Sequence, residues 1–154
     1  MKKVKDYMKK AVVYFSPDDT IFHVAKILSE NEISGAPVLK DRKLVGIISE
    51  TDIIKFLSKK ILPNPKPSSS SSIILLELLK SEIHFYKNLR ELFKTKISNL
   101  MKKKVITVKP EDSILKAAEK ISKYDIRRLP VIDNNGNLIG IISRTDILRA
   151  FSEI

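Results

Sequence analysis

A seven-residue peptide that combines hydroxyl and carboxylate side chains occurs twice in the 154-residue chain, at residues 46–52 and 140–146. Both copies read Gly-Ile-Ile-Ser-x-Thr-Asp. The apolar start is typical of a strand, and the polar end is typical of a helix N-terminus, whose free N–H groups suit a phosphate. The carboxylate can accept hydrogen bonds from two ribose hydroxyls. The alternative is a helix cap that binds nothing. Because a cap needs only one of these polar residues, their retention in both copies favours binding.

Few other residues offer chemistry. The chain has no cysteine, which excludes disulfides, thiolate metal sites and a cysteine nucleophile. Its two histidines, His23 and His84, are far apart in the sequence and predict no zinc site. No coherent set of nucleophile, base and oxyanion donors is recognisable. We therefore predict a protein that is not an enzyme, with no metal and no required cofactor.

The repeated peptide belongs to a longer internal repeat. A shift of 93 residues places Pro17 on Pro110, and after one extra residue a shift of 94 places Gly46 on Gly140. The extra residue falls in residues 134–137, a turn sequence between two apolar runs, where hairpin loops tolerate insertion.

Each copy predicts the same order of elements. A short extended run precedes a proline, and a helix with one apolar stripe follows. Two apolar runs joined by a turn then predict strands covered on both faces, and a last helix begins near the aspartate of the repeated peptide. The predicted fold is α/β (α+β), with two β-α-β-β-α units of about 50 residues that must pack together because each is small. The expected strands are residues 12–15, 36–39 and 44–48 in copy one, and 105–108, 129–132 and 138–142 in copy two.

We place the first unit at residues 4–57, the second at 97–152, and a connector at 58–96. Three prolines and the serine run 68–72 break the connector, and residues 73–94 predict an amphipathic helix. This helix is expected to pack on the repeats or on another subunit. The open alternatives are a docking helix for a partner and a basic surface for nucleic acid.

The net charge is +11, and its excess lies in the first ten residues and in residues 57–104. A basic surface attracts nucleic acid, anionic membrane or acidic protein, but we favour the explanation that it is a solvated lysine-rich surface. Aromatic residues for base stacking are few. The N-terminus lacks the apolar stretch of a signal peptide, so we expect a cytoplasmic protein without membrane attachment.

The ordered set of motifs resembles a CBS domain, and the pair resembles a tandem CBS module, or Bateman module. The resemblance rests on the repeated peptide and on two Pro-Val segments, Ser-Gly-Ala-Pro-Val at 34–38 and Arg-Arg-Leu-Pro-Val at 127–131. It covers about residues 4–57 and 97–152. The connector is similar to the Pro/Ser-rich helical insert of some archaeal members.

The resemblance implies a stand-alone regulatory module that binds AMP, ADP, ATP or S-adenosylmethionine. The two units would pack by pseudo-twofold symmetry and leave two clefts, and two chains would form a homodimer. Ligand binding would be signalled to a partner protein of unknown identity. The alternatives are a nucleic-acid-binding protein that uses the basic connector, and a structural dimerisation module with empty clefts.

The resemblance also implies that each cleft takes residues from both copies. Apolar groups would hold the base, the aspartate would hold the ribose, and serine, threonine and arginine would face phosphate. Cleft A would use Tyr14, Ile33, Ser34 and Ala36 with Ser143, Thr145 and Asp146, and cleft B would use Thr107, Ile126, Arg127, Arg128 and Leu129 with Ser49, Thr51 and Asp52.

The two clefts are expected to be unequal. Copy two has Arg127, Arg128 and Arg144 at the positions of Ser34, Gly35 and Glu50 in copy one. Arginine suits bidentate contacts to phosphate, so cleft B should favour phosphorylated ligands. Alternatively, these arginines are solvated or paired with Asp125 and Glu119. Tyr14 can stack on a base or fill cleft A.

Overall fold

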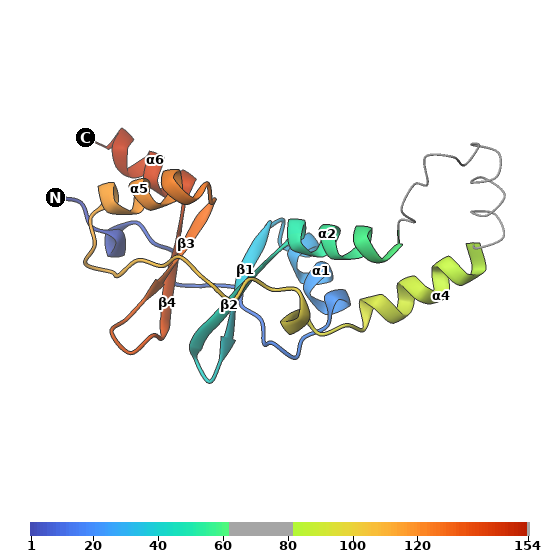
Figure 1. Cartoon of the computed structure of the whole chain (residues 1–154). Helices are drawn as coiled ribbons and strands as arrows, with labels where there is room; N and C mark the ends of the chain where they lie inside the picture. Colours follow the sequence, from blue (N-terminus) through green and yellow to red (C-terminus); the bar gives the residue numbers. More distant parts are fainter. Residues whose placement is uncertain (62–81, 154) are drawn as a thin grey trace. The chain divides into compact units, whose positions relative to one another are not determined.

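The computed structural model describes residues 1–61 and 82–153 (Figure 1). The predicted proline and serine segment of the connector, and the start of its predicted helix, lie outside the described residues. The mixed α/β class predicted from the sequence is confirmed. The elements in chain order are η1 (Val4–Asp6), α1 (Ile21–Glu30), β1 (Gly35–Lys40), β2 (Lys43–Ser49), α2 (Glu50–Ile61), α4 (Glu82–Phe93), η2 (Ile97–Asn99), α5 (Ile114–Tyr124), β3 (Arg128–Ile132), β4 (Leu138–Ser143) and α6 (Arg144–Ser152).

Each copy contains a two-stranded sheet, β1-β2 or β3-β4, followed directly by a helix. The first hairpin turns at Asp41 and Arg42, which both have positive φ, the geometry of a tight two-residue turn. The second hairpin has a longer loop over residues 133–137, with Gly136 at φ +82°. The extra residue predicted from the repeat falls within this loop.

The first strand expected in each copy is reduced to one residue. Phe15 forms a parallel bridge to Val38, and Val108 forms one to Val131. A proline follows two residues later in both copies and has no N–H with which to continue the pairing. The predicted order of elements therefore holds, but its first strands are single bridges.

By backbone contacts the chain forms two compact bodies. Body 1 comprises residues 1–17, 36–47 and the described residues from 102 onward, and body 2 comprises residues 18–35 with the described part of 48–101. In body 1 the hairpin tips of both copies meet, since Lys43 pairs with Asn137 and its Nζ donates to the carbonyl of Asn135 at 2.6 Å.

The first residues of copy one pack on copy two. In body 1 Val4 is fully buried in the core of copy two, and its N–H donates to the carbonyl of Asp112 at 2.9 Å. Body 2 repeats this contact 93 residues later, where the N–H of Ile97 donates to the carbonyl of Asp19 at 2.8 Å. Both the sequence repeat and its backbone contacts thus recur in register.

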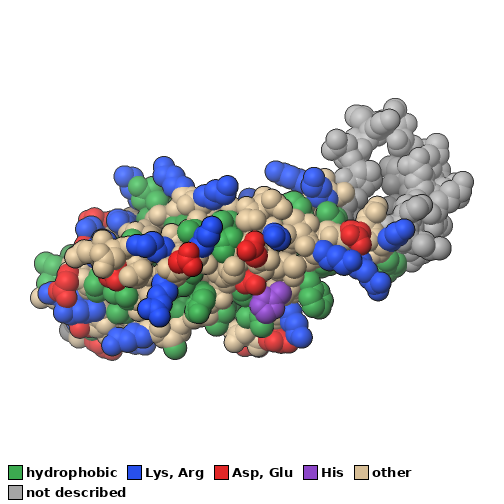
Figure 2. Space-filling model, turned by 90° about the horizontal axis from the view of Figure 1, so that it is seen from below, with side chains coloured by type: hydrophobic (Ala, Val, Ile, Leu, Met, Phe, Trp, Pro, Cys, Tyr) green, Lys and Arg blue, Asp and Glu red, His purple; other side chains and the backbone are tan. Residues whose placement is uncertain are grey.

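The connector helix packs on the first copy. In body 2, α4 lies against α1 and α2, and Phe93 meets Phe22 edge-to-face with ring centroids 6.5 Å apart. Of the two expected packings, on the repeats or on another subunit, residues 82–93 show contact with the first repeat. On the face shown in Figure 2, basic side chains are interspersed with acidic and hydrophobic ones rather than gathered in one stripe. None of the helices in the described ranges combines the length and apolar character required to cross a bilayer.

Candidate functional site

The repeated peptides form the same capped junction between a strand and a helix in both copies. In copy two, the N–H and Oγ of Ser143 each donate to Oδ2 of Asp146 at 2.9 Å, and Ser143 Oγ accepts from the Asp146 N–H at 3.3 Å. In copy one, Ser49 and Asp52 make the same three bonds at 3.0, 2.9 and 3.2 Å. This reciprocal arrangement is a capping box, with aspartate in place of the usual glutamate.

The cap accounts for only part of the peptide. It uses the serine and the aspartate, whereas Thr51 and Thr145, in the first turn of the helices, are exposed. The glycine has a separate reason in copy two, because a Cβ at Gly140 would lie 2.7 Å from the sulfur of Met8. Of the four residues Gly, Ser, Thr and Asp in the repeated peptide, simple capping therefore explains only the serine and the aspartate. It leaves the threonine available to a ligand.

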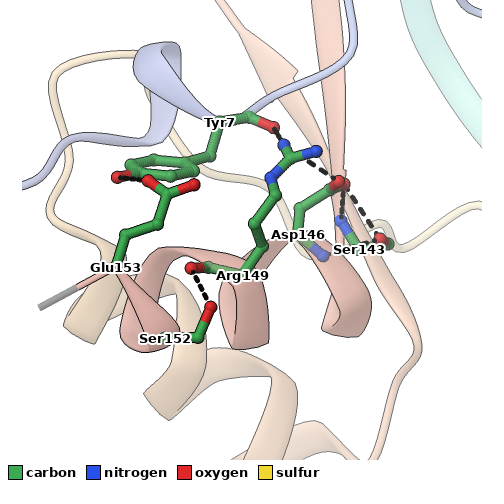
Figure 3. Close-up of polar contacts among 6 residues, drawn as sticks. All are labelled: Tyr7, Ser143, Asp146, Arg149, Ser152 and Glu153. Carbon is green, nitrogen blue, oxygen red and sulfur yellow. Dashed lines mark hydrogen bonds and ion pairs between the residues drawn. The ribbon is translucent and has the colours of Figure 1, made fainter.

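The two aspartates differ in their surroundings. Asp146 is the buried charged residue of the described structure, with 3% of its surface exposed. Its second oxygen, Oδ1, lies 3.5 Å from an NH2 nitrogen of Arg149 (Figure 3). Asp52 is only half-buried, and Lys55 stands at the position that corresponds to Arg149. The sequence repeat did not single out Arg149, although the same alignment pairs it with Lys55.

One of the predicted phosphate-facing arginines is engaged within the chain. Arg144 Nε donates to the carbonyl of Ile126 at 2.9 Å, and its NH2 group lies 3.3 Å from Asp125 Oδ1. The alternative that these arginines pair with Asp125 therefore holds for Arg144. This ion pair is exposed, so a stronger anion can replace it at little free-energy cost. Arg127 is exposed and Arg128 is half-buried.

The remaining predicted residues lie on the strands and on the segments beside them. Ile33 and Ser34 are half-buried and, with Glu50, line a surface cavity of about 510 Å³ in body 2, between α1 and α2. Ala36 and Leu129 are buried, with 1% and 0% of their surface exposed. Tyr14 is exposed, and the carbonyl of Thr107 accepts from Lys120 Nζ at 2.6 Å.

The residues of each predicted cleft come from both bodies, so their assembly into one site stays a prediction. Among residues 1–61 and 82–153, histidine and acidic side chains form no group of three that could hold a metal ion. The arrangement favours hydrogen bonding and electrostatic binding of a small polar molecule at the two helix N-termini.

The CBS domain family model matches residues 4–59 and 97–153. The chain belongs to the CBS domain family. The two matches form a tandem pair, so the family predicted from the repeated motifs is confirmed. The predicted archaeal character agrees with the archaeal origin of the relatives described next.

Two relatives in Methanocaldococcus jannaschii cover nearly all of this CBS pair. The uncharacterized protein MJ1426 is 44% identical over 152 residues, which are 96% of this chain and 89% of that protein. Protein MJ1225 is 31% identical over 149 residues, 97% of this chain but 47% of its own length. The CBS pair thus spans about half of MJ1225 and nearly the whole of MJ1426.

Solved structures share the fold. The crystal structure of MJ1225 matches with a TM-score of 0.76 and 31% identity, covering 97% of this chain and 48% of that one. The CBS domain pair of protein MJ0100 matches with a TM-score of 0.72 and 27% identity, covering 99% of this chain and 98% of that one. That CBS pair was crystallised in complex with 5′-methylthioadenosine and S-adenosyl-L-methionine.

Proposed function

We propose that this CBS pair is a non-enzymatic sensor that binds an adenosine-containing ligand between its two copies. The observation that supports this proposal most directly is the capped helix start, which recurs in both copies with an exposed threonine beside its aspartate. A CBS pair of similar length, that of MJ0100, binds adenosine derivatives, which supports this ligand class. AMP, ADP, ATP and S-adenosylmethionine remain the candidates.

The capping geometry suggests how the aspartates serve a ligand. A carboxylate has about four acceptor positions, and the bonds from Ser143 occupy only the Oδ2 side of Asp146. Ribose hydroxyls can therefore donate to Oδ1 while the helix stays capped. Thr145 and the N-terminal amides of α6 would face a phosphate or another polar group of the ligand. Asp52 and Thr51 would play the same part in cleft B.

The unequal clefts predicted from the arginines remain part of the proposal. Cleft B would favour phosphorylated ligands through Arg127 and Arg128. Cleft A has Ser34 at the position of Arg127 and would favour ligands without phosphate. Binding would change the relative arrangement of the copies or the geometry of a homodimer, and a separate cytoplasmic protein would read that change. This requires the ligand to bind one arrangement more tightly than another.

Calorimetric and thermal-shift titrations with S-adenosylmethionine, 5′-methylthioadenosine, AMP, ADP and ATP test the proposal. At a hundred times its Kd a ligand stabilises the fold by about 2.7 kcal/mol, a rise in Tm of roughly 5–10 °C for a chain of this size. Asp52→Ala and Asp146→Ala should each remove one site, whereas Glu30→Ala, an exposed carboxylate on α1, should leave both. Absence of a response to all five ligands would overturn the proposal.

A further inference from the structure

Arg149 lies where the helix of the second repeated peptide meets the N-terminus of the chain (Figure 3). Its NH2 nitrogen donates to the backbone carbonyl of Tyr7 at 3.2 Å and lies 3.5 Å from Asp146 Oδ1. Its guanidinium also stands over the Tyr7 ring, 5.9 Å from the centroid. One side chain therefore connects the buried carboxylate of the proposed ribose site to a segment more than 130 residues away in the sequence.

That segment, residues 2–9, is here termed the N-terminal strap. It is fixed to copy two along its length, from Lys2 Nζ, which donates to the carbonyl of Ala150 at 2.7 Å, to Lys9, which pairs with Ile141. The Tyr7 hydroxyl donates to Glu153 at 2.8 Å. The contacts of the strap thus reach β4, the strand that ends at Ser143, and α6, the helix that follows it.

The first copy lacks the chemistry of this connection. The repeat places Lys55 at the position of Arg149, and Leu100 at that of Tyr7. Lysine has one point charge and no planar fork, so it is less suited to hold a carboxylate and a carbonyl together. Leucine offers no aromatic face to a cation. The connection therefore distinguishes the two copies, and Lys55 provides a matched control.

We infer that Arg149 is a positioning residue that couples ligand binding at Asp146 to closure of the N-terminal strap. With the strap closed, the Tyr7 carbonyl and ring hold the guanidinium, and the guanidinium holds Oδ1 in place for the ribose hydroxyls. When the strap opens, Arg149 loses its contacts with Tyr7 and is free to turn into solvent. Asp146 then stays buried without its charged partner, and only the bonds from Ser143 to Oδ2 still hold its carboxylate.

The coupling is reciprocal by thermodynamic linkage: a closed strap tightens the ligand, and the bound ligand keeps the strap closed by the same factor. The inference rests on the proposed function, since it assigns a regulator to the proposed ribose site. It also gives that site an output, because the strap carries four lysines at the surface of copy two, and whether these charges are held there would report occupancy.

The test combines calorimetry with hydrogen exchange on the full chain. All variants carry Asp52→Ala, so that remaining binding reports the site of Asp146. S-adenosylmethionine, 5′-methylthioadenosine and AMP serve as probes. Arg149→Gln and Tyr7→Leu should each weaken the tightest-bound probe roughly fivefold or more, and Arg149→Lys less. Lys55→Gln should leave the affinity unchanged.

Hydrogen exchange supplies a readout that a merely structural role would not move. Bound ligand should slow exchange of the strap amides of Val4 and Lys9 in the Asp52→Ala parent, and Arg149→Gln should abolish this slowing while the fold stays intact by circular dichroism. Ligand binding that is as tight in Arg149→Gln as in the parent, or slowing that persists in it, overturns the coupling alone. A wild-type chain that binds none of the probes overturns the proposed function and the coupling with it.

Discussion

Substitution of Val4 tests whether the first residues of the chain are part of the core of copy two. Val4 lies near the N-terminus, where substitutions are usually tolerated, yet its side chain is fully buried in the core of copy two. Val4→Ala removes two carbon groups at about 0.8 kcal/mol each, or about 1.6 kcal/mol in total. The unfilled space adds a cavity term, which brings the expected loss of stability to about 2–3 kcal/mol. The same substitution in an exposed N-terminal tail would lower the free energy of unfolding by less than about 0.5 kcal/mol.

Urea unfolding followed by circular dichroism measures this loss, with Lys10→Ala, an exposed residue directly after the strap, as the control. Hydrogen exchange then locates it. Val4→Ala should speed exchange in α5, β3 and β4, although residue 4 belongs to copy one in the sequence. Ile97→Ala, the equivalent change in the other copy, should act on α1 and α2 instead. A Val4→Ala protein as stable as Lys10→Ala, or one that loosens α1 first, would refute the packing argument.

Three further predictions follow from the strap and the caps. Gly140→Ala should lower stability by about 1–3 kcal/mol in urea unfolding, because the new Cβ would lie 2.7 Å from Met8 Sδ and 3.0 Å from the carbonyl oxygen of Lys9, which is paired with Ile141 and cannot easily move. Hydrogen bonds from two strap lysines lower the pKa of Glu111 from 4.5 to about 2. The ionised form of Glu111 therefore stabilises the closed strap above about pH 4.5, and this stabilisation should fade as the pH falls towards 2. NMR titration of the carboxyl group measures the pKa, and Glu111→Gln should remove this pH dependence. Ser143→Ala and Ser49→Ala should each lower the free energy of unfolding by about 1 kcal/mol, measured in urea, through loss of a helix cap.

The order of elements was predictable because it depends on local patterns. Apolar stripes and runs, prolines and turn residues predicted the helices and hairpins of both copies, and the internal repeat made each copy a check on the other. The reduced first strands escaped prediction because an apolar run such as residues 12–15 gives no measure of how many of its backbone groups find partners. Pairing at Phe15 is decided by the segment around Val38, and not by the run itself.

The strap escaped prediction for a related reason. Residues 1–10 form a basic segment in the sequence, and a basic segment indicates possible partners rather than a place in the core. The available signal was the repeat itself, which places Val4 on Ile97 and Met8 on Met101. A recurrence of apolar residues at the start of both copies indicates a buried structural role. Where such residues pack depends on contacts over more than 100 residues, which a periodicity cannot report.

The candidate site was partly predictable, and the part that was not predictable is where the two copies differ in their residues. Residue types and spacing were enough to find Ser143 and Asp146, and the alternatives of cap and binding site turn out to be compatible. The cap needs Oδ2, so a ligand that displaced it would uncap α6 and lose about 1 kcal/mol. Any ribose contact must therefore be made at Oδ1, where the groups that meet the carboxylate are set by residues outside the repeated peptide. In copy two that group is Arg149, held in turn by Tyr7. On the proposed function, two copies with the same cap would acquire different ligand preferences from the residues around them, and a search for specificity in this CBS pair should look one helical turn beyond the aspartate.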